Sequence, residues 1–285
     1  MELVVLIKGG GEMASAVAHK LARSGFRVCL TELPSPQAIH RGTSFCEAVY
    51  EVEKEVEGVV AKLISSPEGV FRVWKEGKVP IIVDPDAAIK DSLSPDILVD
   101  AIMAKRNTGT KITDARLVIG LGPGFKVGTD AHLVVETNNS ENLGKVLTTG
   151  EAESNTGVPL AISGLTFERV LRSPDDGEFR QVKKMGDLVK RGSLIARVNH
   201  QPVTAQISGV IRALLRDRVK VEPGTKLGEL DPRGDPQLCH TIRPRARTIA
   251  GGVLEAIMMY LSPSIHKFDD VFIQTSAELS RCPRD

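Results

Sequence analysis

The sequence is poor in aromatic residues and carries almost no net charge. Its 285 residues include eight Phe, two Tyr and one Trp, and 37 basic side chains balance 36 acidic ones, which leaves a formal net charge of +1. Nucleic-acid binding relies on a basic surface, and single strands also need aromatic stacking platforms, so this composition argues against a nucleic-acid partner. A content of 41% hydrophobic and 26% charged residues is that of a folded globular chain.

Long hydrophobic runs and paired cysteines are also missing. No stretch approaches the roughly 20 apolar residues that cross a bilayer, and the apolar start at residues 1–7 is too short for a secretory signal. The cysteine spacing includes no CxxC pair, which argues against a disulfide framework or a zinc site, and we expect no metal. The sequence therefore predicts a cytoplasmic protein without a membrane partner, and its four cysteines are Cys29, Cys46, Cys239 and Cys282.

Short apolar segments alternate with helical patterns in the first half of the chain. We expect strands at residues 2–7, 26–31, 59–64, 79–83, 115–120 and 132–136, and helical spacing at 13–21, 70–74 and 97–103. This alternation predicts an α/β class domain with a Rossmann-like, doubly wound parallel sheet, whose ligands bind at the carboxyl ends of the strands. We assign it residues 1–163, since one domain takes roughly 100–200 residues.

The second half contains an internal repeat. Residues 189–195 (VKRGSLI) are echoed by residues 221–227 (VEPGTKL) around a short apolar strand. The pattern resembles the barrel-sandwich hybrid of biotinyl and lipoyl domains, which we place at residues 164–234; some other small all-β domain is the alternative. The expected hairpin tip at residues 199–202 has no lysine, so we expect no lipoyl or biotin group. Residues 235–285 form the third segment, where an apolar helix at 248–261 would pack on the first domain or on a partner subunit.

A glycine-rich turn follows the first expected strand. Gly9-x-Gly11-x-x-Ala14 matches the dinucleotide fingerprint G-x-G-x-x-G/A between a buried strand and a helix, the context that this fingerprint requires. The helix N-terminus would bind a pyrophosphate, and Lys8 adds positive charge beside it. Glu32 ends the second strand, where an acid binds the ribose hydroxyls, and its carboxylate favours NAD over NADP. An ordinary strand–helix turn that needs glycine for packing is the alternative.

Several other segments carry candidate functional groups. A second glycine-rich loop with Gly122 and Gly124 would line the same crevice, or would form a plain turn. Asp130 and His132 are candidates for proton transfer, or belong to a solvated strand face. Each remaining candidate also has a structural alternative. Asp100, Lys105 and Arg106 can be plain charges at a helix end, and Arg243, Arg245 and Arg247 can form a solvated basic face. Cys239, beside His240, is a candidate reactive thiol or a buried structural cysteine.

Five separated blocks together resemble one family. They are residues 7–14, 31–34, 100–107, 120–125 and 251–257. In these blocks the chain is similar to the accessory (maturation) proteins of selenium-dependent molybdenum hydroxylases, distant relatives of the xanthine dehydrogenase accessory factors. The resemblance implies a cytoplasmic bacterial protein that helps to install selenium, or otherwise to finish the molybdenum centre, in a xanthine-dehydrogenase-like client. It implies no particular molecular activity.

The leading hypothesis is an accessory protein that binds NAD(P) or molybdopterin dinucleotide in the crevice. Its expected partner is a molybdenum hydroxylase as client, and assembly into a homo-oligomer is left open. An autonomous NAD-dependent oxidoreductase and a non-catalytic cofactor carrier are the alternatives, so the sequence leaves enzymatic activity open. The expected catalytic residues are Asp100, Lys105 and Asp130. The expected cofactor-binding residues are Lys8, Gly9, Gly10, Gly11, Glu12, Met13, Ala14, Glu32, Arg106, Gly122 and Gly124.

Overall fold

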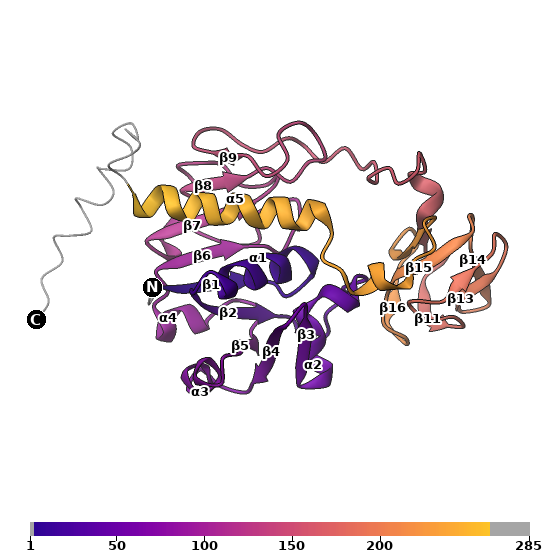
Figure 1. The fold of residues 1–285 in the computed structure, drawn as a ribbon, viewed down its shortest axis with the longest axis horizontal. Helices are drawn as coiled ribbons and strands as arrows, with labels where there is room; N and C mark the ends of the chain where they lie inside the picture. The colour runs from indigo at the N-terminus through magenta and orange to yellow at the C-terminus, as the bar shows by residue number, and fades with distance from the viewer. Residues whose placement is uncertain (1–2, 263–285) are drawn as a thin grey trace, which may run out of the picture.

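The computed structural model describes residues 3–262, which form one large sheet flanked by helices and a smaller part made of strands (Figure 1). The large sheet has nine strands in the order β3-β4-β5-β2-β1-β6-β7-β8-β9. Its inner strands are short apolar runs, as expected of strands that are buried on both faces. Their bounds are β1 Val4–Lys8, β2 Arg27–Glu32, β3 Glu53–Val56, β4 Val59–Ile64, β5 Val79–Val83, β6 Ile97–Asp100, β7 Leu117–Leu121, β8 Leu133–Val135 and β9 Val146–Leu147.

Alternate side chains of these strands contribute to two separate hydrophobic cores, because successive residues of a strand point to opposite faces of the sheet. Val5 and Ile7 pack with α1 and α5 on one face, whereas Leu6 packs with α3 and α4 on the other. The long helix α5 lies beside α1 and across β7 and β8 (Figure 1). The helices are α1 Glu12–Arg23, α2 Ala48–Glu51, α3 Gly69–Lys75, α4 Ile89–Leu93 and α5 Pro244–Leu261.

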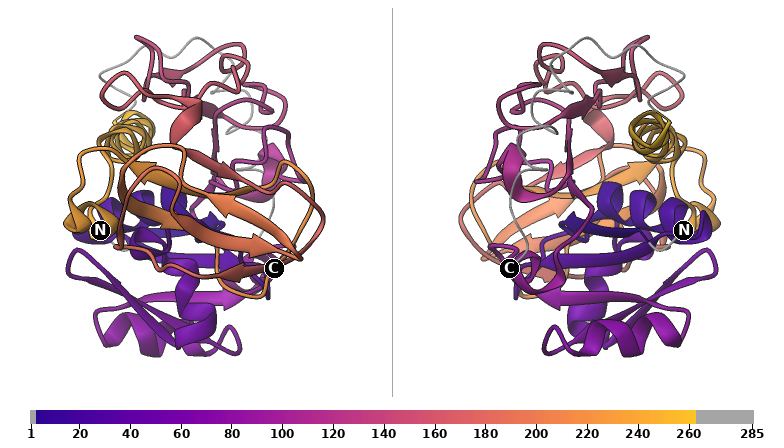
Figure 2. Two further views of the ribbon diagram at one scale, coloured as in Figure 1. Left: turned by 90° about the vertical axis from the view of Figure 1, so that its right-hand side faces the viewer. Right: turned by 90° about the vertical axis from the view of Figure 1, so that its left-hand side faces the viewer.

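The smaller part contains two four-stranded antiparallel sheets, in the orders β10-β17-β15-β12 and β14-β13-β11-β16. Apolar side chains from both sheets share one core, to which Phe179, Ile195 and Leu214 contribute. Figure 2 views this part from its outer side in the left panel. The strands are β10 Val170–Arg172, β11 Gly177–Gln181, β12 Leu188–Val189, β13 Leu194–Val198, β14 Gln201–Thr204, β15 Gly209–Leu214, β16 Lys220–Val221 and β17 Lys226–Asp231.

The segment after β2 joins the two parts. The Leu214 N–H donates to the Ile39 carbonyl at 2.9 Å, and Arg41 Nε donates to the Leu214 carbonyl at 2.8 Å. Arg216 forms an ion pair with Glu47 at 2.5 Å. These bonds tie the end of β15 to the loop that follows β2, so the antiparallel sheets lie next to the carboxyl ends of the large sheet's central strands.

The fold class expected from the sequence needs correction. The large sheet is mixed, because β3 and β9 are antiparallel to their neighbours at its two edges. The hairpin of β3 and β4 lies beyond β5 and β9 lies beyond β8, so the sheet has nine strands where the Rossmann order 3-2-1-4-5-6 has six. No α-helix connects β6 to β7 or β7 to β8, so the sheet is not doubly wound there, and α5 from the far end of the chain covers those strands.

The strands outside the large sheet do not support the predicted combination of a Rossmann-like domain with a barrel-sandwich hybrid domain. The molecule is a mixed α/β protein with one large, mostly parallel sheet and two small antiparallel sheets. The helical spacing expected at residues 97–103 was also wrong, because Ile97–Asp100 is the buried strand β6, which pairs with β1 and β7. A short apolar run cannot be assigned to helix or strand by periodicity alone.

Candidate functional site

The larger of two adjoining cavities opens at the carboxyl ends of the central strands. It has a volume of about 790 Å³ and is lined by the turn after β1, the end of β2, the segment 36–40, the loop after β6 and the first turn of α5. Five of the residues proposed from the sequence line it: Gly9, Gly11, Glu12, Met13 and Glu32. Ligands of open α/β sheets bind at this edge, where connections leave neighbouring strands in opposite directions.

Glu32 is held in a fixed orientation on the wall of this cavity. Its carboxylate accepts hydrogen bonds from the Gly10 N–H at 2.7 Å and from the Leu33 N–H at 2.7 Å. Burial is the largest influence on its pKa and raises it, against the opposing effect of these two bonds. Gly11 stands across the turn, just before α1, and no atom lies within 4 Å of the position that a Cβ would take there. A bulky side chain at Gly11 would therefore meet open space.

A buried network of charges forms the rear of the cavity. Arg243 donates to both carboxylate oxygens of Glu12, one of them at 2.5 Å, and to Glu229 at 3.2 Å. His40 Nε2 lies 3.9 Å from Glu12 and 3.6 Å from Glu229. Although burial opposes ionisation, the neighbouring cations hold the pKa of both carboxyl groups below the ordinary value. The network joins α1, the segment after β2, β17 and the start of α5.

We expect the free energy of unfolding to fall as the pH drops below 6.5, because of His40. Burial is the largest cause, and together with Arg243 it lowers the pKa of this imidazole from 6.5. The folded protein then binds fewer protons here than the unfolded chain, so this stability is present above pH 6.5 and is lost as the pH falls towards the folded-state pKa. Urea unfolding at about pH 7.5 and about pH 5.5 measures the loss.

A histidine at the surface supplies the control for this experiment. His40→Gln should reduce the difference in stability between the two pH values, whereas His200→Gln, at an exposed hairpin tip, should preserve it. An unchanged pH difference in His40→Gln would show that another group is responsible.

Lys8 and Asp100 are paired with each other, and neither of them lines the larger cavity. The ammonium lies 3.4 Å from the Asp100 carboxylate, and both groups bond to the Thr110 hydroxyl: Lys8 donates to it and it donates to Asp100, each at 2.6 Å. All three side chains are buried. This triad fastens the loop 101–110 to the ends of β1 and β6, and that loop lines the cavity through Ile102 and Met103.

Other residues proposed from the sequence have packing or loop-fixing contacts. Asp130 accepts from Asn107 Nδ2 at 3.1 Å and from the Lys126 N–H at 2.9 Å. Gly124 has a φ of +106°, and a Cβ there would overlap the backbone of Arg106. Arg106, Gly124 and Asp130 thus belong to packed loop contacts and do not line the larger cavity. Gly10, Ala14 and Gly122 do not line it either, and their Cβ positions or side chains are buried against other parts of the protein.

The histidine and cysteine candidates are engaged in structural contacts. His132 Nδ1 accepts from the Val118 N–H at 2.9 Å, and burial lowers its pKa. Cys239 is buried, its thiol donates to the Ile211 carbonyl at 3.5 Å, and burial raises its pKa. A raised thiol pKa disfavours the reactive thiolate. Cys239 therefore fits the structural alternative.

Arg243 and Arg245 line the candidate site, and sequence reasoning assigned them too little weight. A solvated basic face was the simpler interpretation of alternating arginines, yet Arg243 is 13% exposed within the ion network and Arg245 lies at the boundary of both cavities. The Arg245 Nε atom is buried and finds no hydrogen-bond partner among residues 3–262, while the Nη2 atom of the same side chain donates to the Thr137 carbonyl at 2.6 Å. Only Arg247 fits the expected pattern, since its exposed guanidinium pairs with Glu57.

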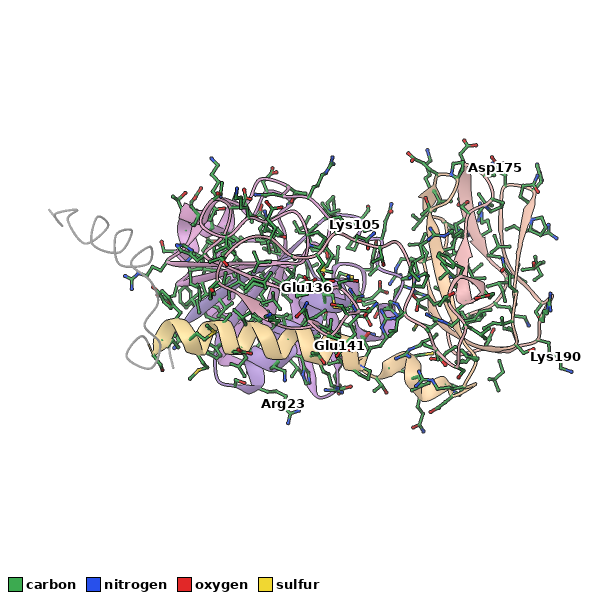
Figure 3. The ribbon with its side chains drawn as sticks, turned by 90° about the horizontal axis from the view of Figure 1, so that it is seen from above. Arg23, Lys105, Glu136, Glu141, Asp175 and Lys190 are labelled. Carbon is green, nitrogen blue, oxygen red and sulfur yellow. The ribbon has the colours of Figure 1, made fainter. Side chains whose placement is uncertain are left out.

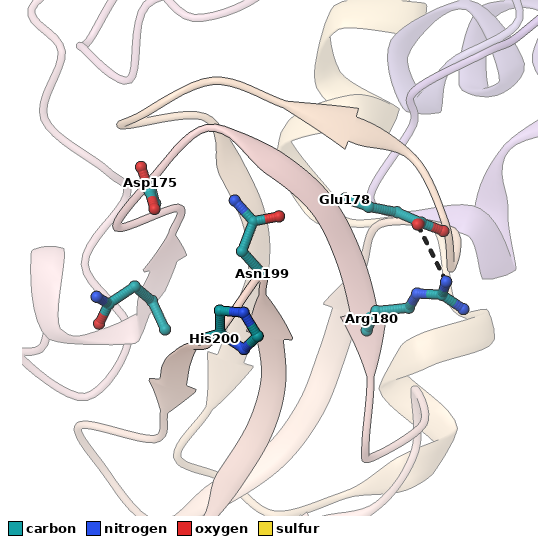
Figure 4. Close-up of a pocket in the computed structure, with 6 residues that line it drawn as sticks. Asp175, Glu178, Arg180, Asn199 and His200 are labelled. Atoms are coloured by element: carbon teal, nitrogen blue, oxygen red, sulfur yellow. Dashed lines mark hydrogen bonds and ion pairs between the residues drawn. The ribbon is translucent and has the colours of Figure 1, made fainter.

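A further cavity lies at the hairpin tip of the antiparallel part, far from the large sheet (Figure 4). Glu178 and Arg180 on its rim are paired with each other at 3.0 Å, and Asn199 Nδ2 donates to the Asp176 carbonyl at 2.6 Å. Figure 3 shows Asp175 and Lys190 on this outlying part, whereas Lys105 lies near the junction with the large sheet. Because its charged groups already have partners, the tip is a weaker candidate than the cavities at the junction.

Residues 3–262 contain no cluster of three or more His, Cys, Asp or Glu side chains arranged to hold a metal ion. Within the same residues, no helix combines the length and apolar character needed to span a membrane.

Comparison with known proteins gives one similar sequence. No family model matches the chain. It is 41% identical over 268 residues to an uncharacterized protein, YqeB, of Escherichia coli (strain K12). The match covers 94% of this chain and 50% of that protein, so the chain spans about half the length of this relative.

Comparison with solved structures gives only distant matches. They include the ectoine utilization protein EutE (DoeB) from Ruegeria pomeroyi in a product-bound form, with 14% identity over 80% of this chain and 85% of the other and a TM-score of 0.24. An aspartoacylase family protein from Mesorhizobium loti has 14% identity over 80% and 84%, with a TM-score of 0.26. Succinylglutamate desuccinylase/aspartoacylase from Rhodobacter sphaeroides has 13% identity over 80% and 85%, with a TM-score of 0.25. Likenesses this weak give no basis for assigning an activity.

The comparisons overturn the family expected from the sequence, because none of them supports it. No family model matches, and neither the sequence relative nor the solved structures named above are described as accessory proteins of molybdenum hydroxylases. The predicted role in selenium insertion or molybdenum-centre maturation, the molybdenum hydroxylase client and the NAD-dependent oxidoreductase alternative are therefore corrected and not retained. Several residues in the resembling blocks have packing roles of their own, as Gly124 and Gly252 do, so those blocks can be alike for reasons of fold.

Proposed function

We propose that the larger cavity binds a phosphorylated small molecule of the nucleotide class. The observation that carries this proposal is that Gly11 and Glu32 line one cavity at the carboxyl ends of the central strands. The N-terminus of α1 supplies partial positive charge beside Gly11, which favours a phosphate group. The Glu32 carboxylate, oriented by two backbone N–H groups, is suited to accept hydrogen bonds from ribose hydroxyls.

The contacts of Arg41 support a ligand without a phosphate on that ribose. Arg41 donates to the Leu214 carbonyl at 2.8 Å and lies 3.6 Å from the Glu47 carboxylate. It is thereby committed to the junction between the two parts, and Glu32 alone supplies charge at the end of β2. A carboxylate at this place repels a 2′-phosphate, so NAD⁺ should bind more tightly than NADP⁺.

Gly11→Trp tests the proposal, because the indole would fill open space in the cavity. Titration calorimetry with NAD⁺, NADP⁺ and ADP-ribose should show saturable binding to the native chain and a loss of at least about tenfold in affinity, or about 1.4 kcal/mol, in the variant. Gly251→Trp is a matched control, since a Cβ at Gly251 also meets no atom within 4 Å and this glycine lies in α5, outside both cavities. Equal affinities in the native chain and Gly11→Trp would refute the proposal.

The ligand names derived from the sequence, NAD(P) and molybdopterin dinucleotide, remain predictions within this class. The absence of lipoyl or biotin groups and the cytoplasmic location also remain predictions. The domain boundaries at residues 163 and 234 remain a proposal as well.

A further inference from the structure

The smaller cavity, next to the nucleotide site proposed above, has a strong excess of positive charge. It has a volume of about 290 Å³ and adjoins the larger cavity at Met103, Lys226, Arg243 and Arg245, which line both. Two carboxylates lie on its wall, Glu153 and Glu229. Its six cationic lining residues are Lys105, Arg169, Arg172, Lys226, Arg243 and Arg245. By contrast, the larger cavity is lined by three cations and three carboxylates.

The two carboxylates of the smaller cavity already have hydrogen-bond or ion-pair partners. Glu229 is contacted by Lys226, by Arg243 at 3.2 Å and by Arg169 at 3.6 Å. Glu153 accepts hydrogen bonds from the side chains of Asn138 at 2.6 Å and Asn142 at 2.9 Å. Neither carboxylate is within ion-pair distance of the remaining cations, so the excess charge is not neutralised by the wall.

Three cations of the cavity lack a carboxylate partner among residues 3–262. Arg245 and Arg172 donate to the backbone carbonyls of Thr137 and Gly224, at 2.6 and 2.9 Å. Lys105 can donate to the Asn155 side-chain oxygen at 3.0 Å when that amide takes its better-bonded orientation. Within the described part of the chain, the buried Arg245 Nε has no hydrogen-bond partner. A buried donor without a partner is unfavourable, and a bound acceptor would satisfy it.

We infer that this smaller cavity is a binding site for a multiply charged phosphate group. The guanidinium fork of arginine matches the tetrahedral oxygens of a phosphate through paired N–H donors. Asn138, Asn155 and Thr156 on the wall add neutral donors for further oxygens. This inference is carried by the charge of the smaller cavity and does not depend on which ligand occupies the larger one.

Pyrophosphate is the probe, with inorganic phosphate and malonate as comparison anions, and titration calorimetry of the full chain measures affinity. Pyrophosphate should bind at least about tenfold more tightly than malonate, and its affinity should fall as salt increases. Equal affinity for malonate would overturn the assignment to phosphate groups. Absence of saturable pyrophosphate binding would overturn the site altogether.

Substitutions locate the bound anion. Arg245→Met should weaken pyrophosphate binding by at least about tenfold, and Arg245→Lys, which keeps the charge but loses the fork, should weaken it less. Arg172→Met provides a second test at an exposed position where folding is not at risk, and should weaken binding severalfold. Arg180→Met, at the distant hairpin tip, should have no effect. Unchanged binding in both Arg245→Met and Arg172→Met would contradict the inference.

Gly11→Trp separates this inference from the nucleotide proposal, because Gly11 lines only the larger cavity. Pyrophosphate binding should persist in Gly11→Trp even though nucleotide binding is lost. If this substitution abolishes pyrophosphate binding, the anion lies at the start of α1 and the smaller cavity is not its site.

Discussion

Gly252→Ala is expected to lower the free energy of unfolding by about 3 kcal/mol, the upper part of the range for overpacked interiors. A Cβ at Gly252 would overlap the carbonyl oxygen of Gly144 and press on the Val135 side chain. The Gly144 carbonyl is backbone and cannot rotate away as a side chain would. The clash would separate α5 from β8 and from the loop between β8 and β9, and urea unfolding followed by circular dichroism would measure the loss.

The neighbouring glycine is the matched control, because it lies in the same helix with no atom within 4 Å of its Cβ position. Gly251→Ala should raise stability by up to about 1 kcal/mol, since alanine is the better helix former. The two substitutions add the same methyl group one residue apart and should shift stability in opposite directions. If both stabilise the protein, α5 does not pack on Gly144 as the structure shows.

The sequence was informative where local pattern decides the structure. The strands at 59–64 and 79–83 were predicted with the bounds of β4 and β5, and the helix of residues 13–21 lies within α1. Buried parallel strands read as continuous apolar runs, and an amphipathic helix has a period of its own, so neither needs knowledge of distant residues. The repeat at residues 189–195 and 221–227 likewise marked the antiparallel part of the chain.

Strand order and connection type could not be obtained in this way. Nothing local in the sequence shows that the hairpin of β3 and β4 pairs beyond β5 at the edge of the sheet. The loops that follow β6 and β7 contain no helix, and a helix more than 100 residues later covers these strands instead. Because the covering helix is so distant in the sequence, no periodic pattern near β7 or β8 indicates it.

The candidate site shows the same division. The glycine turn and Glu32 were found from spacing, because a strand–turn–helix unit is local. The role of Arg245 depends on its contact with Thr137, which is more than 100 positions away in the sequence. The role of Lys226 depends on its place between two adjoining cavities. Lys8 was proposed as a cofactor contact and Asp100 as a catalytic residue, because both charges are visible in the sequence. The sequence does not show that the Thr110 hydroxyl joins the two side chains.

Glu229→Gln is expected to destabilise the fold by about 3 kcal/mol, because loss of one member of a buried ion network leaves its partners uncompensated. The Glu229 side chain is 4% exposed and contacts Lys226, Arg243 and Arg169. Glu178→Gln is the control, since Glu178 pairs with Arg180 in an exposed position and should change stability by no more than about 0.5 kcal/mol. Equal losses in the two variants would contradict the importance of the buried network.

The same substitution should strengthen anion binding. Removing the Glu229 charge leaves six cations and one carboxylate on the wall of the smaller cavity, so pyrophosphate affinity should rise severalfold in the folded variant. General damage to the protein would lower stability and affinity together. A less stable protein that binds pyrophosphate more tightly would show that Glu229 neutralises cations which otherwise hold the ligand, whereas weaker binding by folded Glu229→Gln would place the anion elsewhere.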